Sequence, residues 1–169
     1  MATPNAIAVA LFNAAAGGYT NQIAADTNSI ANAVGLILEK DISNDALFVE
    51  HLLGNFGVTP SMSVYSQARN ELFNLVTTQG RGKAVVVAVD FLKSQEGAWN
   101  DYALVALNFA VKVSEATLYS ANNPNQRDIT KLVASVTGVD TDQVAIANAL
   151  ASTNPAFSLN PIPADASRN

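Results

Sequence analysis

The sequence contains no cysteine, a single histidine and few charged residues. Without cysteine, the chain can form no disulfide and no thiolate metal site, and it has no cysteine nucleophile. Only 14% of the residues are charged, against roughly 25% in an average globular domain. Because such a surface carries few charges to repel other copies, it can be buried against another protein at low desolvation cost.

Nucleic acid and membrane partners are not expected. The nine Lys and Arg residues are scattered singly in a chain of net charge −5, so no basic patch indicates nucleic-acid binding. No apolar run approaches the length of about 18 residues that a membrane-spanning helix needs. We therefore expect no transmembrane segment and no nucleic-acid partner.

The N-terminus, MATPNAIAVALFNAAAGG, is apolar and rich in small residues, as a secretory signal would be. It has no Lys or Arg before the apolar stretch, so the charged region of a signal peptide is missing. Thr3 and Pro4 instead predict a helix N-cap followed by proline at the first helical position. We therefore interpret this segment as a helix of the mature protein, with no cleaved N-terminal signal.

Capping residues and glycine breaks recur along the chain and predict an all-α fold, a compact bundle of about eight helices. Thr20, Ser43, Asp128 and a second Thr-Pro pair at 59–60 are expected to start helices, and glycines at 17–18, 54, 80 and 138 to lie near helix ends. The expected helices are residues 4–16, 20–40, 44–54, 60–79, 83–94, 99–116, 129–136 and 142–151.

Two of these helices have informative patterns. Four valines in residues 85–89 favour a strand by propensity, but a single strand would have no partner, so we interpret 83–94 as a buried helix. The helix at 99–116 has apolar residues spaced alternately by three and four, which predicts a seam against other helices. That seam comprises Trp99, Tyr102, Ala106, Phe109, Val113 and Ala116, with Asn108, Lys112 and Glu115 expected on the polar side.

The last 18 residues, STNPAFSLNPIPADASRN, form a segment that we call the C-terminal arm (residues 152–169), following a helical domain at 1–151. Prolines at 155, 161 and 163 remove backbone donors and favour an extended chain. The apolar residues Phe157, Leu159 and Ile162 are more than a solvated tail requires. The arm is expected either to fold back over its own domain or to lie in a groove of a neighbouring subunit.

No pattern indicates catalysis or metal binding. Asp41, Ser43 and Asp45 match positions one, three and five of a calcium-binding EF-hand loop, but its glycine and bidentate glutamate positions hold Ala46 and Leu52. A helix N-terminus explains the same acidic residues. No nucleophile elbow, phosphate-binding loop or second histidine is present. We therefore expect a protein that is not an enzyme and has no metal or cofactor.

The single histidine, His51, adjoins Glu50, but consecutive residues on a helix point about 100° apart and do not face each other. His51 also follows Phe48 and Leu47 by three and four residues, so it lies on the apolar side of its helix. We predict a partly buried structural histidine.

The order of several segments resembles a known module. FVEHLLGNFGV, GKAVVVAVDFLKS and YALVALNFAVKVSEATLYS follow one another with a glycine turn before the second. Residues 55–58 (NFGV) are similar to an N-L-G-[LIV] turn, and residues 108–113 (NFAVKV) to an F-N-x-K-V run with its elements shifted. Over about residues 45–150 the chain resembles an α-helical module of surface-layer and RTX-type proteins of Gram-negative bacteria, exported by type I secretion.

This resemblance implies an extracellular protein of the bacterial cell surface, exported without a cleaved N-terminal signal. Modules of this kind are thought to lie against the outer membrane and its polysaccharide, while calcium-binding repeats form the lattice. The present sequence has no G-G-x-G-x-D repeat. We therefore expect assembly contacts to come from the helical domain and its arm.

Two functions remain open. The first is a structural protein that assembles with copies of itself into a surface layer, tube or filament, with Phe157, Leu159 and Ile162 anchoring the arm in the subunit interface. The second is a module that binds envelope polysaccharide and anchors a secreted protein to the cell surface. Its candidate aromatic residues are Tyr19, Tyr65, Trp99 and Tyr119.

Overall fold

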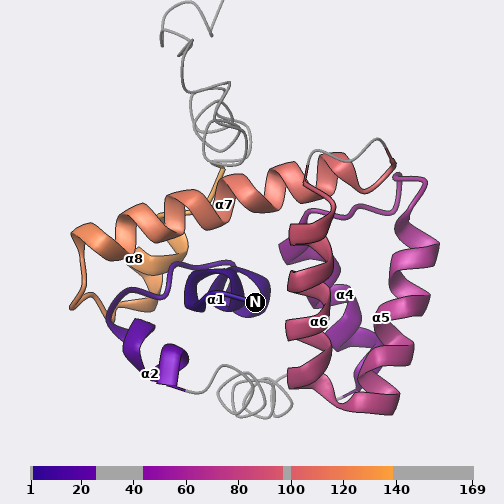
Figure 1. Ribbon diagram of the computed structural model, residues 1–169, viewed down its shortest axis with the longest axis horizontal. Helices are drawn as coiled ribbons and strands as arrows, with labels where there is room; N and C mark the ends of the chain where they lie inside the picture. The colour runs from indigo at the N-terminus through magenta and orange to yellow at the C-terminus, as the bar shows by residue number, and fades with distance from the viewer. Residues whose placement is uncertain (1, 26–43, 97–99, 139–169) are drawn as a thin grey trace, which may run out of the picture.

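The computed structural model describes residues 2–25, 44–96 and 100–138 (Figure 1). These residues form seven α-helices and one 3-10 helix and contain no β-strand, which confirms the all-α prediction. The helices are α1 (Pro4–Phe12), η1 (Gly17–Tyr19), α2 (Thr20–Ala25), α4 (Asp45–Phe56), α5 (Tyr65–Gln79), α6 (Arg81–Ser94), α7 (Ala103–Asn122) and α8 (Ile129–Ala134).

Helix α1 lies at the centre of the bundle. Figure 1 shows it between the long helix α7 and the group formed by α4, α5 and α6, and it contacts α4, α6 and α7. All of residues 5–11 are buried. A helix that is apolar on every side is stable in water only when other elements surround it. The small, apolar sequence that looked like a signal peptide is thus the centre of the core.

Helices α4, α5 and α6 pack side by side, α5 against both of the others. Helix α5 buries Ala68, Leu72 and Val76, spaced four residues apart, and most of its other residues are polar. Only Gly80 separates α5 from α6, and its φ of 88° is readily adopted by glycine alone. The valine-rich segment is a helix, as predicted, because Val85, Val89 and their neighbours meet α1 and α5 on a helical spacing.

Helix α7 spans the bundle and contacts α1, α4 and α6. Its buried residues include Ala106, Phe109 and Ala116, so the predicted seam is confirmed over the described residues. The ring of Phe109 meets that of Phe56 edge to face, with centroids 5.2 Å apart. This contact joins α7 to the C-terminal end of α4.

A buried polar cluster fixes the loop after α1. The Oδ1 atom of Asn5 accepts hydrogen bonds from the Ala16 N–H and the Ser120 hydroxyl, each at 2.9 Å. The Gly17 N–H in turn donates to the Ser120 oxygen at 2.8 Å. Because these groups are buried, each bond also avoids the cost of an unpaired polar atom. One asparagine therefore ties the loop to both α1 and α7.

Three expected helix boundaries at the N-terminal side were wrong. The first helix starts after its predicted cap, Thr3, whose Oγ1 accepts from the Ala6 N–H at 3.2 Å, but it ends at Phe12 because Asn13 adopts a left-handed φ of 51°. Thr20 is not an N-cap, since it is already helical and continues from η1. The N-cap of α4 is Asn44, whose side chain accepts from the Leu47 N–H at 2.8 Å, and not Ser43.

Further boundaries differ in the middle of the chain, where α6 begins at Arg81 and not at 83, and α7 covers Ala103–Asn122 and not 99–116. Helix α4 passes through Gly54 and ends at Gly57, which has a φ of 81°. Residues 60–64 form turns and a bend, so α5 begins at Tyr65 and not at Pro60. The cap at Asp128 is confirmed, because its carboxylate accepts from the Thr130 N–H at 3.0 Å.

Several predictions fall outside the described residues. These are the helix expected beyond Ala25, the seam residue Trp99, the eighth helix at 142–151 and the C-terminal arm with its anchors Phe157, Leu159 and Ile162.

Within the described part of the chain, no helix combines the length and apolarity needed to cross a membrane.

Candidate functional site

His51 is part of the contact between α4 and the end of α1. Its Nε2 lies 2.7 Å from the Leu11 carbonyl oxygen, and because a carbonyl can only accept, Nε2 carries the proton. The side-chain amide of Asn55 donates to the Ala10 carbonyl at 2.8 Å. The last carbonyls of a helix have no partner within it, so α4 supplies donors to two of them. His51 is a half-buried structural residue, as predicted.

Two basic residues, Arg81 and Lys112, are buried, although Lys112 was expected on the polar side of its helix. Arg81 is 9% exposed; its Nε donates to the Asp45 carboxylate at 3.1 Å, and its guanidinium lies 4.8 Å from the centre of the Phe48 ring. Lys112 is 7% exposed, and its Nζ donates to the Asn55 carbonyl at 3.3 Å. Arg81 thus contacts an acidic residue and an aromatic ring of α4, and Lys112 a carbonyl of α4, so both contribute to packing on this helix.

No metal centre is formed by the described residues, since they contain no cluster of three His, Cys, Asp or Glu side chains. Asp45, one of the EF-hand candidates, lies in the first turn of α4 and pairs with Arg81. Glu50 is exposed on α4. These residues do not come together with a nucleophile, so we find no site for acid–base chemistry among them.

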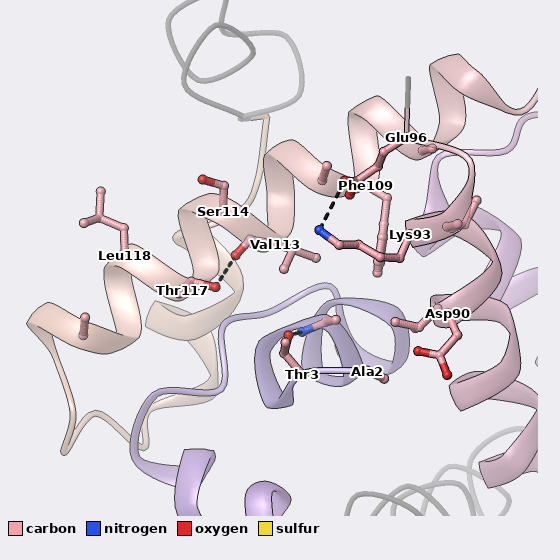
Figure 2. A pocket seen from close by; sticks show the side chains of 16 residues that line it. Ala2, Thr3, Asp90, Lys93, Glu96, Phe109, Val113, Ser114, Thr117 and Leu118 are labelled. Atoms are coloured by element: carbon pink, nitrogen blue, oxygen red, sulfur yellow. Dashed lines mark hydrogen bonds and ion pairs between the residues drawn. The ribbon is translucent and has the colours of Figure 1, made fainter. Parts of the chain in front are cut away.

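Two apolar hollows are found among the described residues. The larger lies between α1, α6 and α7, and we call it the α1–α7 groove (Figure 2). Its volume is about 490 Å³, within the range of roughly 300–1,000 Å³ typical of ligand pockets. Small side chains on α1 and α7 make it hollow. The lining residues are Ala2, Thr3, Ala6, Val89, Asp90, Leu92, Lys93, Glu96, Ala106, Phe109, Ala110, Val113, Ser114, Thr117, Leu118 and Ala121.

The two walls of the α1–α7 groove differ in charge. The charged residues that line the groove are Asp90 and Lys93 of α6 and Glu96 in the turn after it, and Lys93 Nζ lies 3.2 Å from Glu96 Oε2 in an ion pair. The α7 wall has no charged residue. Its only polar residues are Ser114 and Thr117, and the hydroxyl of Thr117 donates to the Val113 carbonyl at 2.7 Å. Leu118 at one end is 57% exposed. Among the described residues, no side chain covers Leu118, so the wall presents an apolar surface at this end.

A smaller hollow of about 330 Å³ lies between α4, α5, α6 and α7, and we call it the Tyr102 pocket. The rings of Phe91 and Tyr102 meet edge to face with centroids 5.1 Å apart. The Tyr102 hydroxyl oxygen is buried and has no hydrogen-bond partner. Burial, and next to it the negative charge of Glu71, raise the pKa of Tyr102 above its usual value of 10.0.

A third hollow, of about 300 Å³, has a polar lining that includes Thr20, Asn21 and Thr117. The nearby aromatic ring, that of Tyr19, is covered by the Arg127 guanidinium at 4.7 Å from the ring centre. Tyr65 is similarly approached by Arg69 at 5.8 Å. The aromatic candidates for sugar binding in the described residues are therefore not gathered in one hollow.

The structure thus adds features that sequence reasoning missed. The expected anchors lie outside the described residues, whereas the α1–α7 groove and the Tyr102 pocket were not foreseen. The small side chains of the alanines at 106 and 110 indicate either close packing of another helix or a hollow, and the sequence alone does not distinguish the two. No protein-family model, curated protein or solved structure matches the chain.

Proposed function

We propose that this protein is a non-enzymatic structural subunit that assembles with copies of itself into a surface layer, tube or filament at the bacterial cell surface. The observation that carries the proposal is the pair of apolar hollows on a chain with few charges. Burying apolar surface contributes about 25 cal/mol per Å² to association. The extracellular location follows from the resemblance of the sequence to secreted surface proteins.

Exposed apolar side chains support the same proposal. Seven large ones are between 37% and 57% exposed, and two of them, Phe91 and Leu118, line the hollows. Single exposed apolar residues are ordinary, but those that border an apolar hollow extend it into a larger surface. The full set is Phe12, Leu47, Phe73, Phe91, Leu104, Leu118 and Ile129.

The C-terminal arm supplies the second half of such a contact. Open assembly needs a heterologous interface, in which two different patches of the subunit meet. An extended arm with Phe157, Leu159 and Ile162 is one patch, and an apolar hollow on another copy is its complement. This pairing lets subunits add without closing into a dimer.

The test is electron microscopy of the full chain at low and high concentration, with and without calcium. Ordered polymers without calcium are the expected result, because the sequence has no calcium-binding repeat. Replacing Phe157, Leu159 and Ile162 with serine in one variant should abolish the polymers and leave helicity unchanged. A variant with Asn154→Gln and Asn160→Gln is the matched control in the same arm, and it should assemble normally. Polymers that survive the triple substitution would remove the arm from the mechanism.

A chain that stays monomeric under every condition would contradict self-assembly. It would favour the second candidate, a module that binds envelope polysaccharide. The polar hollow beside Asn21 and Thr117 is the one observation that favours this candidate, because amides and hydroxyls are suitable partners for sugar hydroxyls.

A further inference from the structure

The two apolar hollows differ in length. Residues of α7 from Ala106 to Ala121 line the α1–α7 groove, and at 1.5 Å per residue they extend over about 22 Å. The Tyr102 pocket is lined on α5 from Ala68 to Leu75, which corresponds to about 10 Å. The first hollow is therefore suited to an extended segment, and the second to a single side chain or a small group.

The spacing of the anchors in the C-terminal arm matches the longer hollow better than the shorter one. Phe157 and Ile162 are five residues apart, and a polyproline II segment advances about 3.1 Å per residue, so in that conformation they would be about 16 Å apart. This separation fits within the α1–α7 groove and exceeds the Tyr102 pocket. Leu159, between them, can contact the same surface.

The chemistry of the arm also matches the groove. Residues 155–163, PAFSLNPIP, contain no charged side chain, and neither does the α7 wall of the groove. Their three prolines have no N–H group, so fewer backbone donors lose water when the segment is covered. The charged residues of the α6 wall, with the Lys93–Glu96 ion pair, stay at one side.

The chain between the domain and the anchors is long enough to reach another copy. Eighteen residues separate Gly138 from Phe157. With the expected helix at 142–151 rising about 1.5 Å per residue and the other residues extended, this stretch reaches up to about 40 Å. A domain of this size has a radius of gyration of about 14 Å. The anchors can therefore extend beyond their own domain.

From these observations we infer that the α1–α7 groove of one subunit is the acceptor for residues 155–163 of a neighbouring copy. The inference rests on the proposed function and names the two surfaces of the heterologous contact. Phe157, Leu159 and Ile162 cover the alanines and Leu118 along α7, while the α6 wall borders the bound segment. Each subunit accepts one arm and offers one, which produces a chain of subunits.

Disulfide trapping tests this contact in the full-length protein, because the sequence has no cysteine of its own. One preparation carries Ser114→Cys, on the α7 wall, and a second carries Ser158→Cys, between two anchors. Both changes preserve size and leave the anchors intact. A small tag on one preparation separates the mixed dimer from the two homodimers on a non-reducing gel. We expect the mixed dimer to form at least tenfold more than in the matched control, Ser66→Cys on α5 with Ser158→Cys, since Ser66 lines neither hollow.

Each other outcome overturns the inference in a different way. Equal trapping at Ser114 and Ser66 would exclude the groove as the acceptor, and if polymers still form, the proposed function stands with another contact. A chain that carries both Ser114→Cys and Ser158→Cys and links only within itself would show that the arm covers its own groove. No mixed dimer together with no polymers at any concentration would contradict both the inference and self-assembly.

Discussion

Helices α1 and α5 show two ways in which a helix is held in this protein. In α1 residues 5–11 are all buried, whereas α5 buries three of its 15 residues, all on one side. Helix α1 has neighbours all round, since it contacts α4, α6 and α7, whereas α5 packs mainly on α4 and α6. The amphipathic pattern of α5 reveals which side faces the core. The uniform composition of α1 reveals that it is buried, but not what surrounds it.

The largest expected effect is on the free energy of unfolding when one leucine in each of these two helices is replaced by alanine. Leu11 in α1 is fully enclosed, whereas Leu72 in α5 lines the Tyr102 pocket. Leu11→Ala should lower the free energy of unfolding by about 3–5 kcal/mol and Leu72→Ala by about 2–3 kcal/mol, because only the first leaves a closed cavity. Urea denaturation followed by circular dichroism measures both. Equal losses would contradict the idea that α1 is enclosed and α5 is open.

A smaller difference is expected between two glycines that both have positive φ. Gly17, after α1, has a φ of 53°, and a Cβ there would meet the Leu132 side chain and lie 2.6 Å from the Gln126 carbonyl oxygen. Gly57, before α5, has a φ of 81° and open space around it.

Gly57→Ala should therefore cost only the left-handed backbone energy, about 1–2 kcal/mol. Gly17→Ala adds overpacking and should cost about 3 kcal/mol or more in total. Thermal and urea unfolding of the two variants side by side give the difference. A Gly17 variant no less stable than the Gly57 variant would show that the loop after α1 is looser than its hydrogen bonds indicate.

The smallest effect concerns Tyr102, beside α5. Tyr102→Phe removes a buried hydroxyl that has no partner, so the free energy of unfolding should stay the same or rise by up to about 1 kcal/mol. The raised pKa means that the neutral form is favoured in the folded chain. As pH rises above about 10, Tyr102 ionises first in the unfolded chain, and the native protein loses stability until its own pKa is passed.

The phenylalanine variant lacks this loss, so its advantage over the native protein should widen above pH 10.0, the usual pKa of tyrosine. Urea titrations at neutral and alkaline pH measure the change, with Tyr119→Phe as the control for removing one hydroxyl from another helix. An advantage that does not depend on pH would contradict the raised pKa.

The predicted features that were confirmed depend on local interactions. The caps at Thr3 and Asp128 bond to groups two or three residues away, and the spacing of Ala106, Phe109 and Ala116 belongs to one helix. The errors arose where local signals compete. Asn13 ended a helix four residues earlier than expected, and Gly54 did not end one because Gly57 was available for the left-handed position.

The candidate site also has one part that can be predicted from the local sequence and one part that depends on tertiary contacts. The apolar residues and prolines of the C-terminal arm are read directly from the sequence, so its anchors were predicted, and they stay a prediction. The α1–α7 groove was not predicted, because it consists of residues from α1, α6 and α7 that are far apart in the chain.

The sequence by itself determined that this protein is helical, where α1 and α8 begin, and which face of α7 is apolar, because hydrogen bonds and periodicity within a helix involve only nearby residues. The tertiary structure alone decided that α1 is central, that Arg81 and Lys112 are buried against α4, and that a long apolar groove opens along α7. Those features depend on which helices meet and how closely their side chains fill the space between them.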